Sequence, residues 1–212
     1  MSDPSLIFET EFINGSAAGA LERALAVLSS GGLVAFPTDT VYGLAADIHS
    51  AAAIEKIFTA KGRDSQKPIA VLLGSAAQLT LVAQNLPPAA QRLAEAFWPG
   101  ALTLVVPRRT DLPANLSPTL TIGVRMPDHP LALELLRRSG PLATTSANLS
   151  GRQDALSAQD VLDQLGGRID LVLDGGRVAG GKPSTVVDCT GERLKVLRQG
   201  PLTLDQLEAA LT

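Results

Sequence analysis

The sequence contains few of the residues that form disulfides, metal centres or membrane spans. Among its 212 residues there is one cysteine, Cys189, and there are two histidines, His49 and His129. A single cysteine excludes an internal disulfide and is typical of a reducing compartment, and without a Cys or His cluster no zinc site is expected. No apolar run approaches the ~18 residues of a membrane span, and no basic region precedes an apolar stretch at the N-terminus. We therefore expect a soluble, cytoplasmic protein with no membrane partner.

Aromatic residues are also scarce, at 3% of the chain, although 45% of it is hydrophobic. Leu, Val, Ile and Ala must therefore build the core. Cys189 stands in an apolar run and is interpreted as a small core residue rather than a nucleophile. The net charge of −3 argues against a general DNA- or RNA-binding protein and leaves a local basic groove open. Neither a Walker motif nor a GxGxxG motif is present.

Hydrophobic periodicity predicts strands that alternate with helices, which is typical of an α/β protein. Strands are predicted at residues 6–8, 33–36, 69–73, 101–106, 121–125, 141–144, 169–173, 186–189 and 194–197. Helices are predicted after the capping residues Ser16, Ser50, Asp128, Ser157 and Thr203, and at 75–84 and 88–97. Residues 108–118 are expected to form a mobile loop. We predict a single domain over 1–212, with a twisted mixed sheet, flanking helices, a core at about 16–200 and a C-terminal helix at about 203–211.

The stretch LVAFPTDTVYGL at 33–44 joins an apolar strand to a run of polar groups. Thr38, Asp39, Thr40 and Tyr42 follow the strand at the position where α/β proteins place ligand sites. The alternative is an ordinary surface turn capped by Thr and Asp. We expect Asp39 and Thr40 to shape the turn by hydrogen-bonding its backbone. Tyr42 is expected to pack as much as it binds, and Thr38 to contact a ligand.

Cationic groups stand at the ends of other predicted elements. Lys61 and Arg63 come at the end of the second helix, where they either complement the helix dipole or wrap a polyphosphate. Arg125 ends a buried strand, so it meets either an anionic ligand or a structural ion-pair partner. Arg198 ends the strand predicted at 194–197.

Small polar groups complete the pattern. Ser146 and Asn148 follow the strand at 141–144, and Ser184 precedes the strand at 186–189. If these strand ends converge, hydroxyls and cations line one cleft that suits anionic groups such as phosphates. No Ser-His-Asp or Cys-His arrangement is evident, so we expect the site to position reactants rather than to attack them.

Seven sequence blocks occur in order along the chain: PTDTVYGL, KGR, WPGALTLVV, VRMPDHP, TSANLSG, PSTVVD and VLRQG. Together they resemble the YrdC/TsaC family of threonylcarbamoyl-adenylate synthases, in its single-domain form, over roughly residues 16–200. The resemblance implies a twisted open α/β sheet around a concave basic cleft. It also implies a nucleotidyltransferase that makes L-threonylcarbamoyladenylate and pyrophosphate from L-threonine, bicarbonate and ATP. That reaction is the first step toward N6-threonylcarbamoyladenosine at position 37 of tRNA.

The resemblance further implies roles for individual residues. A Lys-x-Arg and Ser-x-Asn tetrad lies in the family's cleft. The matching residues here are expected to be catalytic and to bind ATP, and they are Lys61, Arg63, Ser146 and Asn148. The residues expected to bind threonine are Thr38, Arg125, Thr144 and Ser184, with Arg125 paired to the carboxylate. Thr121 and Arg198 are expected to contact ATP as well. Mg²⁺ is expected with the ATP and few or no protein ligands.

Partners and alternatives follow from the same resemblance. A downstream threonylcarbamoyl-transferase complex is expected to receive the adenylate, and a contact with tRNA or another RNA stays open. Some family members carry a histidine after the KGR block that helps read threonine, whereas this chain has the run IAVLL. Longer members add a second domain and a linker that covers the site, so the loop at 108–118 is the candidate for closing it here.

Two other functions stay open at this point. One is a carbamoyl-adenylate-forming enzyme that uses carbamoyl phosphate. Relatives of that kind sit in much longer chains with zinc-finger and acylphosphatase modules, which are not found here. The other is an RNA- or tRNA-binding module without turnover, which the acidic net charge and the scarcity of aromatic residues disfavour.

Overall fold

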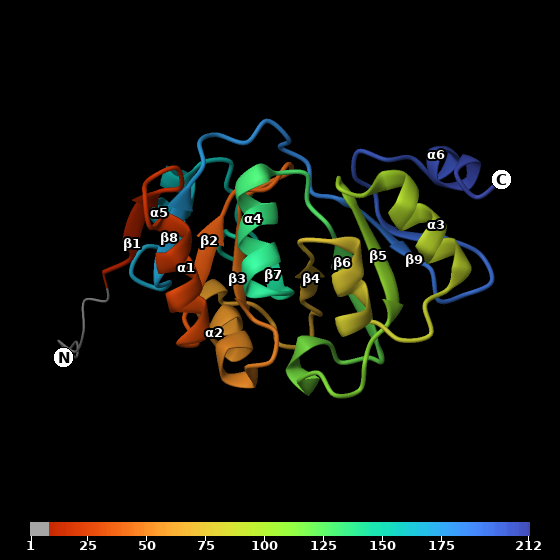
Figure 1. The fold of residues 1–212 in the computed structure, drawn as a ribbon, viewed down its shortest axis with the longest axis horizontal. Helices are drawn as coiled ribbons and strands as arrows, with labels where there is room; N and C mark the ends of the chain where they lie inside the picture. The colour runs from red at the N-terminus through yellow and green to blue at the C-terminus, as the bar shows by residue number, and fades with distance from the viewer. Residues whose placement is uncertain (1–8) are drawn as a thin grey trace.

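The computed structural model describes residues 9–212, and the strand predicted at 6–8 lies outside them. Ten strands form one sheet with helices on both faces (Figure 1). The strands are β1 (Glu11–Asn14), β2 (Val34–Phe36), β3 (Gly43–Asp47), β4 (Ala70–Leu72), β5 (Leu102–Pro107), β6 (Thr121–Arg125), β7 (Leu142–Ser146), β8 (Leu171–Asp174), β9 (Thr185–Asp188) and β10 (Lys195–Arg198). The α-helices are α1 (Ala20–Ser29), α2 (Ala51–Lys61), α3 (Pro88–Phe97), α4 (Pro130–Ser139), α5 (Ala158–Leu165) and α6 (Leu204–Ala209), and η1 (Ala76–Leu81) and η2 (Ala114–Leu116) are 3-10 helices.

The sheet is mixed, as predicted, and its strand order differs greatly from the chain order. The order is β1-β8-β2-β3-β7-β4-β6-β5-β9-β10. Neighbours are parallel in β1/β8, β2/β8, β4/β6 and β5/β9, and antiparallel in the other pairs. The register places Leu72 beside Arg125, Gly123 beside Val105, and Thr103 beside Val186. Because residues two apart in a strand share a face, these side chains all lie on one face of the sheet.

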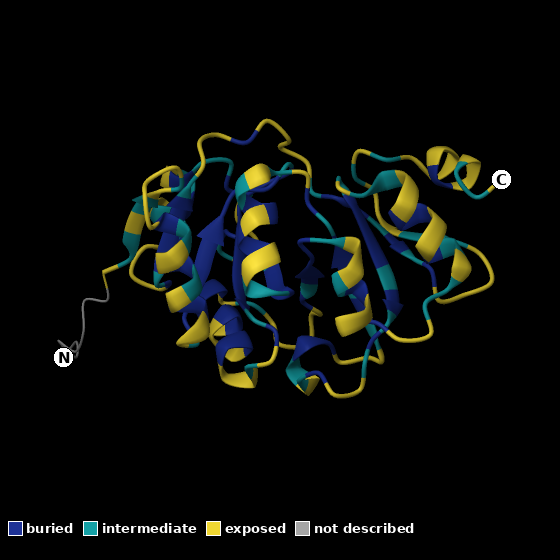
Figure 2. Ribbon diagram, in the orientation of Figure 1, coloured by how far each residue is buried: buried dark blue, intermediate teal, exposed yellow. Residues whose placement is uncertain are grey.

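Helices cover only part of that face. α1 and α4 pack on it over β2, β3 and β8, where they bury Val34, Phe36 and Leu171 (Figure 1). The opposite face is covered by α2, α3 and α5 through a larger apolar cluster, so most strand residues are buried while the outer helix faces are exposed (Figure 2). The uncovered part of the first face, over β4, β6, β5 and β9, lines the cavity described below.

Three of the predicted helix caps are confirmed. The Ser50 side chain accepts a hydrogen bond from the backbone N–H of Ala53 at the start of α2. Ser157 and Thr203 each form a reciprocal capping box at the start of α5 and α6. These helix starts were predictable because the capping signal is local in sequence.

Two predicted caps are wrong. α1 begins at Ala20 after Gly19, whose φ of 81° is left-handed, and Ser16 bonds to the side chain of Asn14 instead. At α4 the capping position belongs to His129, and the helix begins at Pro130 without a side-chain cap. Asp128 instead donates its backbone N–H to Asp39, so a contact distant in sequence replaces the local one.

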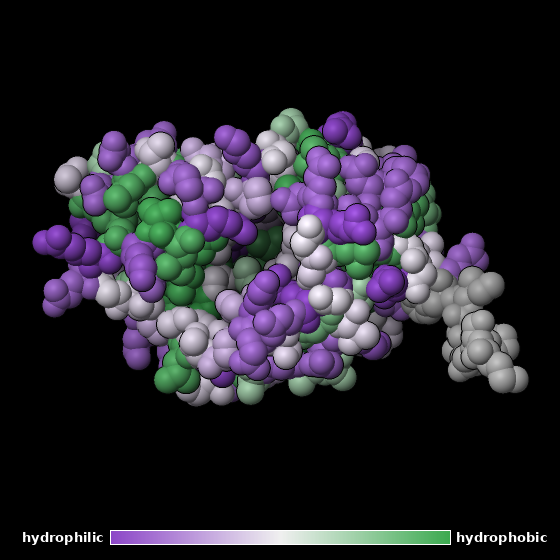
Figure 3. Space-filling view, turned by 180° about the vertical axis from the view of Figure 1, so that it is seen from behind, coloured by the Kyte–Doolittle hydropathy of each residue, from purple (hydrophilic) through white to green (hydrophobic). Residues whose placement is uncertain are grey.

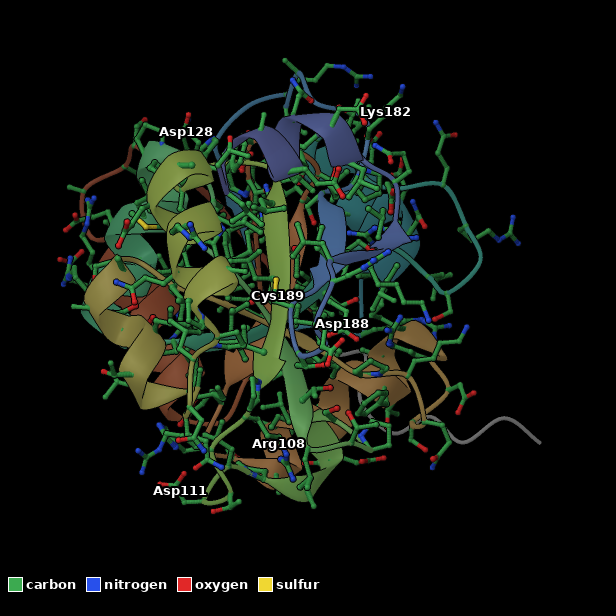
Figure 4. The ribbon with its side chains drawn as sticks, turned by 90° about the vertical axis from the view of Figure 1, so that its right-hand side faces the viewer. Arg108, Asp111, Asp128, Lys182, Asp188 and Cys189 are labelled. Carbon is green, nitrogen blue, oxygen red and sulfur yellow. The ribbon has the colours of Figure 1, made fainter. Side chains whose placement is uncertain are left out.

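The segment at 108–118, expected to be a mobile loop, contains η2 and is tied to the domain. Arg108 Nη1 donates to the carbonyls of Leu112 and Pro113, and Asn115 donates to the carbonyl of Ala51 in α2. In Figure 4, Arg108 and Asp111 lie at the end of the molecule opposite Asp128. None of these residues lines the cavity, so the segment does not cover it in this structure.

Cys189 packs in the interior, as predicted. It follows β9, is 2% exposed, and donates its backbone N–H to the carbonyl of Val105 in β5 (Figure 4). Burial raises the pKa of its thiol to about 12, so the thiolate that a nucleophile requires is scarce near neutral pH. Across residues 9–212, no helix is long and apolar enough to cross a membrane.

Candidate active site

A cavity of about 380 Å³ lies on the uncovered part of the sheet face. Its floor is formed by alternate residues of β4, β6 and β5, and by Val186 of β9 with Ser184 just before it. The strand residues are Ala70 and Leu72, Gly123 and Arg125, and Thr103 and Val105. Figure 3 shows a hollow near the middle of this side of the molecule, with apolar surface at its bottom and polar groups around it. The floor is therefore a face of the sheet, where the sequence indicated only the strand ends.

The predicted convergence of strand ends is nevertheless present. Thr38 after β2, Arg125 in β6, Ser146 in β7 and Arg198 in β10 all line the cavity. The predicted residues Arg63, Thr144 and Ser184 line it too. Three predicted site residues, Lys61, Asn148 and Thr121, do not line it.

In the turn after β2, Thr38 makes the backbone hydrogen bonds that were expected of Asp39 and Thr40. The Thr38 hydroxyl donates to the carbonyl of Val41, 2.7 Å away, and accepts from the backbone N–H groups of Thr40 and Val41, so it shapes the turn. Asp39 and Thr40, expected to do so, instead bind Arg125. Tyr42 is fully buried and donates to the carbonyl of Gly176, and burial raises its pKa to about 12.

Arg125 is anchored on three sides and still faces the cavity. Its Nη2 lies 2.5 Å from Asp39 Oδ1, its Nη1 donates to the Thr40 hydroxyl over 2.9 Å, and its Nε donates to the carbonyl of Gly100. A guanidinium has five N–H donors, so two of them remain for a ligand. Asp39 compensates the charge of this 6% exposed arginine, which removes part of the cost of burying it.

Lys61 lies behind the cavity wall, and its donors are already occupied. Its ammonium donates to the carbonyls of Ser146 and Asn148 and, over 3.4 Å, to Asn148 Oδ1. An ammonium has three N–H donors, so none remains for a phosphate in this arrangement. The side chain is 2% exposed, and burial together with the charge of Arg63 lowers its pKa to about 8.

Asn148 is occupied in the same way. Its Oδ1 accepts from the Ser146 hydroxyl over 2.6 Å, and its Nδ2 donates to the carbonyls of Leu149 and Arg152. Lys61 and Asn148 therefore fix the turn after β7, and Ser146 is the member of that turn whose side chain reaches the cavity.

Two further arginines retain most of their donors. Arg63 Nη2 donates to the carbonyl of Pro68, while its Nε is buried and has no hydrogen-bond partner among the described residues. Arg198 donates from Nε and Nη2 to the backbone and hydroxyl oxygens of Ser184. Burial lowers the pKa of both guanidiniums, which remain cationic near neutral pH. Desolvated cations with unused donors favour an anionic ligand.

The remaining predicted residues have distinct positions. The Ser184 hydroxyl lies 2.7 Å from the Thr103 hydroxyl on the floor. The Thr144 hydroxyl donates to the carbonyl of Leu142. Thr121 starts β6 on the same face as Gly123 and Arg125, beyond the cavity edge, and its hydroxyl lies 2.9 Å from that of Thr119.

Sequence reasoning missed several lining residues, among them the polar side chains of Thr103, Thr145 and Asp154. Thr103 was assigned to an apolar strand, and the alternation of Leu102, Thr103 and Leu104 was the signal that it faces the other way. Asp154 lies in the loop before α5, and no local pattern distinguishes it from the other acidic residues of the chain.

The protein has a mixed α/β sheet whose open face carries three arginines and several hydroxyls. No His or Cys is among the described residues that line the cavity, and this lining is suited to binding and positioning anionic ligands. The chain belongs to the Sua5/YciO/YrdC family. The model of that family, described as "Telomere recombination", matches residues 26–200.

Individual relatives agree with this assignment. A threonylcarbamoyl-AMP synthase of Bacillus subtilis is 44% identical over 197 residues, which is 90% of this chain and 56% of the relative. The structure of Pyrococcus abyssi Sua5 complexed with L-threonine matches with a TM-score of 0.89 and 38% identity, over 96% of this chain and 60% of that one. Escherichia coli YciO matches with a TM-score of 0.82 and 26% identity, over 98% and 100%. The chain thus spans somewhat more than half the length of the first two proteins.

Proposed function

We propose that this protein forms L-threonylcarbamoyladenylate and pyrophosphate from L-threonine, bicarbonate and ATP, for N6-threonylcarbamoyladenosine formation at position 37 of tRNA. The observation that carries the proposal is the cavity itself, where the anchored Arg125 and the donor-rich Arg63 and Arg198 surround hydroxyl groups. The names of the B. subtilis relative and of the threonine-bound P. abyssi structure support this choice among anionic substrates.

Threonine is placed at the Arg125 end of the cavity. The two unused donors of Arg125 suit a carboxylate, and its three protein contacts hold the guanidinium in one orientation. Thr38, Thr144 and Ser184 line this part, and the hydroxyls of Thr144 and Ser184 face the amine and hydroxyl of the substrate in this proposal. The Thr38 hydroxyl uses its donor and both lone pairs within the turn, so Thr38 contacts threonine by packing against it.

The phosphates of ATP are assigned in this proposal to Arg63 and Arg198. Arg198 then lies between the two substrates, because it also hydrogen-bonds to Ser184. Ser146 contacts the reacting phosphate, while Lys61 and Asn148 act as positioning residues that hold Ser146. Thr121 lies beyond the cavity edge, and in this proposal it contacts the part of the nucleotide that extends out of the cavity. These roles follow from which residues line the cavity and from which of their N–H donors have no partner in the protein.

The reaction requires no protein nucleophile. The amine of threonine attacks carbon dioxide derived from bicarbonate and loses a proton, which gives a carbamate. A carbamate oxygen then attacks the α-phosphorus of ATP, the bond from that phosphorus to the bridging oxygen breaks, and pyrophosphate leaves. Charge develops on phosphate oxygens, so cations held in place lower the barrier.

The residues present fit a Mg²⁺ ion carried by the triphosphate rather than a protein-bound metal. Among residues 9–212 no group of three or more His, Cys, Asp or Glu side chains is placed to hold a metal ion. Mg²⁺ commonly keeps several waters and binds through phosphate oxygens and one or two carboxylates. When bound, the ion neutralises phosphate charge, and Asp154 is the carboxylate that lines the cavity.

The product dictates the partners that we propose. A mixed carbamic–phosphoric anhydride hydrolyses readily, so a threonylcarbamoyl-transferase complex in the same compartment must receive it. That compartment is the cytoplasm in this proposal, which suits a single buried thiol. Direct contact with tRNA is a separate hypothesis that turnover does not require.

Pyrophosphate release tests the function directly. We expect release only when L-threonine, bicarbonate, Mg²⁺ and ATP are all present, with serine and carbamoyl phosphate run in parallel. Release that persists without threonine contradicts the proposal, and release that requires carbamoyl phosphate identifies the other adenylate-forming reaction. Binding of tRNA without nucleotide turnover identifies an RNA-binding module.

The pH dependence of turnover tests the role of Lys61. Its pKa is lowered to about 8, and above that pH a neutral amine has two N–H donors for three acceptors. We therefore expect pyrophosphate formation to decline with an apparent pKa of about 8 on the alkaline side. In Lys61→Arg the guanidinium stays charged, so the decline should move to higher pH. An alkaline limb that is identical in both proteins shows that Lys61 does not cause it.

A further inference from the structure

Asp154 stands out because its backbone is fixed while its carboxylate has no partner. The flanking carbonyls accept hydrogen bonds from three parts of the domain: Arg152 O from Asn148 Nδ2, Gln153 O from Gln164 Nε2, and Ala155 O from the Tyr42 N–H. The carboxylate itself makes no hydrogen bond or ion pair with the residues that the structure describes. The loop thus holds an unpaired acidic group at the cavity wall.

The charges around Asp154 belong to the phosphate end of the cavity. Its carboxylate interacts electrostatically with Lys61 and Arg198. Arg125, at the threonine end, is influenced by Asp39 and Arg198 and not by Asp154. Among the described lining residues, Asp154 is the sole carboxylate, in a site where the other charged groups are arginines.

A carboxylate at this position opposes the binding of a polyanion. A triphosphate carries several negative charges, and like charges held a few ångström apart in a partly desolvated cavity repel strongly. A divalent cation between the two removes the repulsion and converts it into attraction. Mg²⁺ accepts this geometry, because it combines phosphate oxygens and waters with one or two carboxylates.

We propose that Asp154 faces the divalent cation of the metal–nucleotide complex, directly or through a metal-bound water, and so selects metal-bound over metal-free nucleotide. This inference rests on the proposed function, because it requires ATP in this cavity. It extends that function by assigning to Asp154 a discrimination that the arginines cannot provide, since they attract both forms of the nucleotide.

The test measures binding without turnover. Calorimetry compares α,β-methylene-ATP, whose α–β linkage cannot be cleaved, in Mg²⁺ and in EDTA. The proteins are the unchanged chain, Asp154→Asn, Asp154→Glu, and the control Asp205→Asn, which removes the same charge from an exposed position on α6. Asp154→Asn should fold normally because its side chain makes no hydrogen bond or ion pair with the described residues, and its melting temperature is recorded to establish this.

We expect Asp154→Asn to bind the Mg²⁺ complex more weakly and the metal-free nucleotide more tightly, so that the preference for the metal complex falls about tenfold. Asp154→Glu and Asp205→Asn should keep the preference. Equal tightening of both forms overturns the inference, because Asp154 is then only a repulsive charge. Equal weakening, or no change, overturns it as well.

The outcome also separates this inference from the proposed function. If the unchanged chain binds neither form of the nucleotide, the nucleotide site itself is wrong. If it binds both and Asp154→Asn keeps the metal preference, the nucleotide site stands and the role of Asp154 is rejected.

Discussion

Replacement of Arg63 by alanine is expected to reduce the turnover number for pyrophosphate formation by about 10²- to 10³-fold. The guanidinium has one hydrogen bond to the protein, at Pro68, and its buried Nε has none among the described residues. Its donors are therefore aimed at the ligand rather than at the fold, and the charge that develops on the phosphates loses a fixed counterion. Steady-state kinetics with saturating threonine and ATP measure the change.

The control for Arg63 is Arg193→Ala, which removes an arginine from an exposed position between β9 and β10. We expect that variant to keep full activity. Because Arg63 makes few internal contacts, its variant should unfold at nearly the same temperature as the unchanged protein. A turnover number within about threefold of the original, less than 1 kcal/mol of barrier, excludes Arg63 from the transition state.

Replacement of Arg125 should act on threonine and leave ATP almost unaffected. Loss of hydrogen bonds to a charged group costs about 2–3 kcal/mol, so we expect the KM for threonine to rise roughly 30- to 150-fold. The KM for ATP should change by less than about threefold, within 1 kcal/mol. Arg125→Lys should not restore binding, because an ammonium cannot hold three anchors and still present two parallel donors.

Stability must be separated from binding at this position. Arg125→Ala leaves Asp39, whose side chain is 17% exposed, without its 2.5 Å partner, and breaking such a pair costs about 3–5 kcal/mol. The double variant Asp39→Asn, Arg125→Gln removes both charges and should recover much of that stability while threonine binding stays weak. A double variant with normal threonine KM, or equal losses for threonine and ATP, shows that Arg125 is not a dedicated carboxylate partner.

Much of the fold was predictable because its signals are local. The capping boxes at Ser157 and Thr203, and the apolar runs of β5 and β6, each depend on a few consecutive residues. The failures lie where distant contacts decide the outcome. Aspartate often caps helices, yet the backbone N–H of Asp128 donates to Asp39, a residue distant in sequence.

The sequence predicted most of the residues at the candidate site, but it did not predict which of them hydrogen-bond to one another. Seven of the ten residues that the motifs indicated line the cavity. Their hydrogen-bond partners could not be predicted, because the partners are distant in sequence. Arg125 bonds to Asp39, and Lys61 bonds to Asn148, across more than eighty positions. Thr38 rather than Asp39 accepts the backbone N–H groups of the turn for the same reason, since residue type does not reveal which neighbour the fold supplies.

The strand order has a consequence for how this protein is made. The cavity floor joins β4, β6, β5 and β9 side by side, so a strand from residues 185–188 completes a surface begun at residues 70–72. Arg198 comes later still. On the ribosome, the growing chain therefore has no complete binding surface until nearly all of it has been synthesised. Chains that terminate before Ser184 lack that residue, Val186 and Arg198 and therefore should not form the complete cavity.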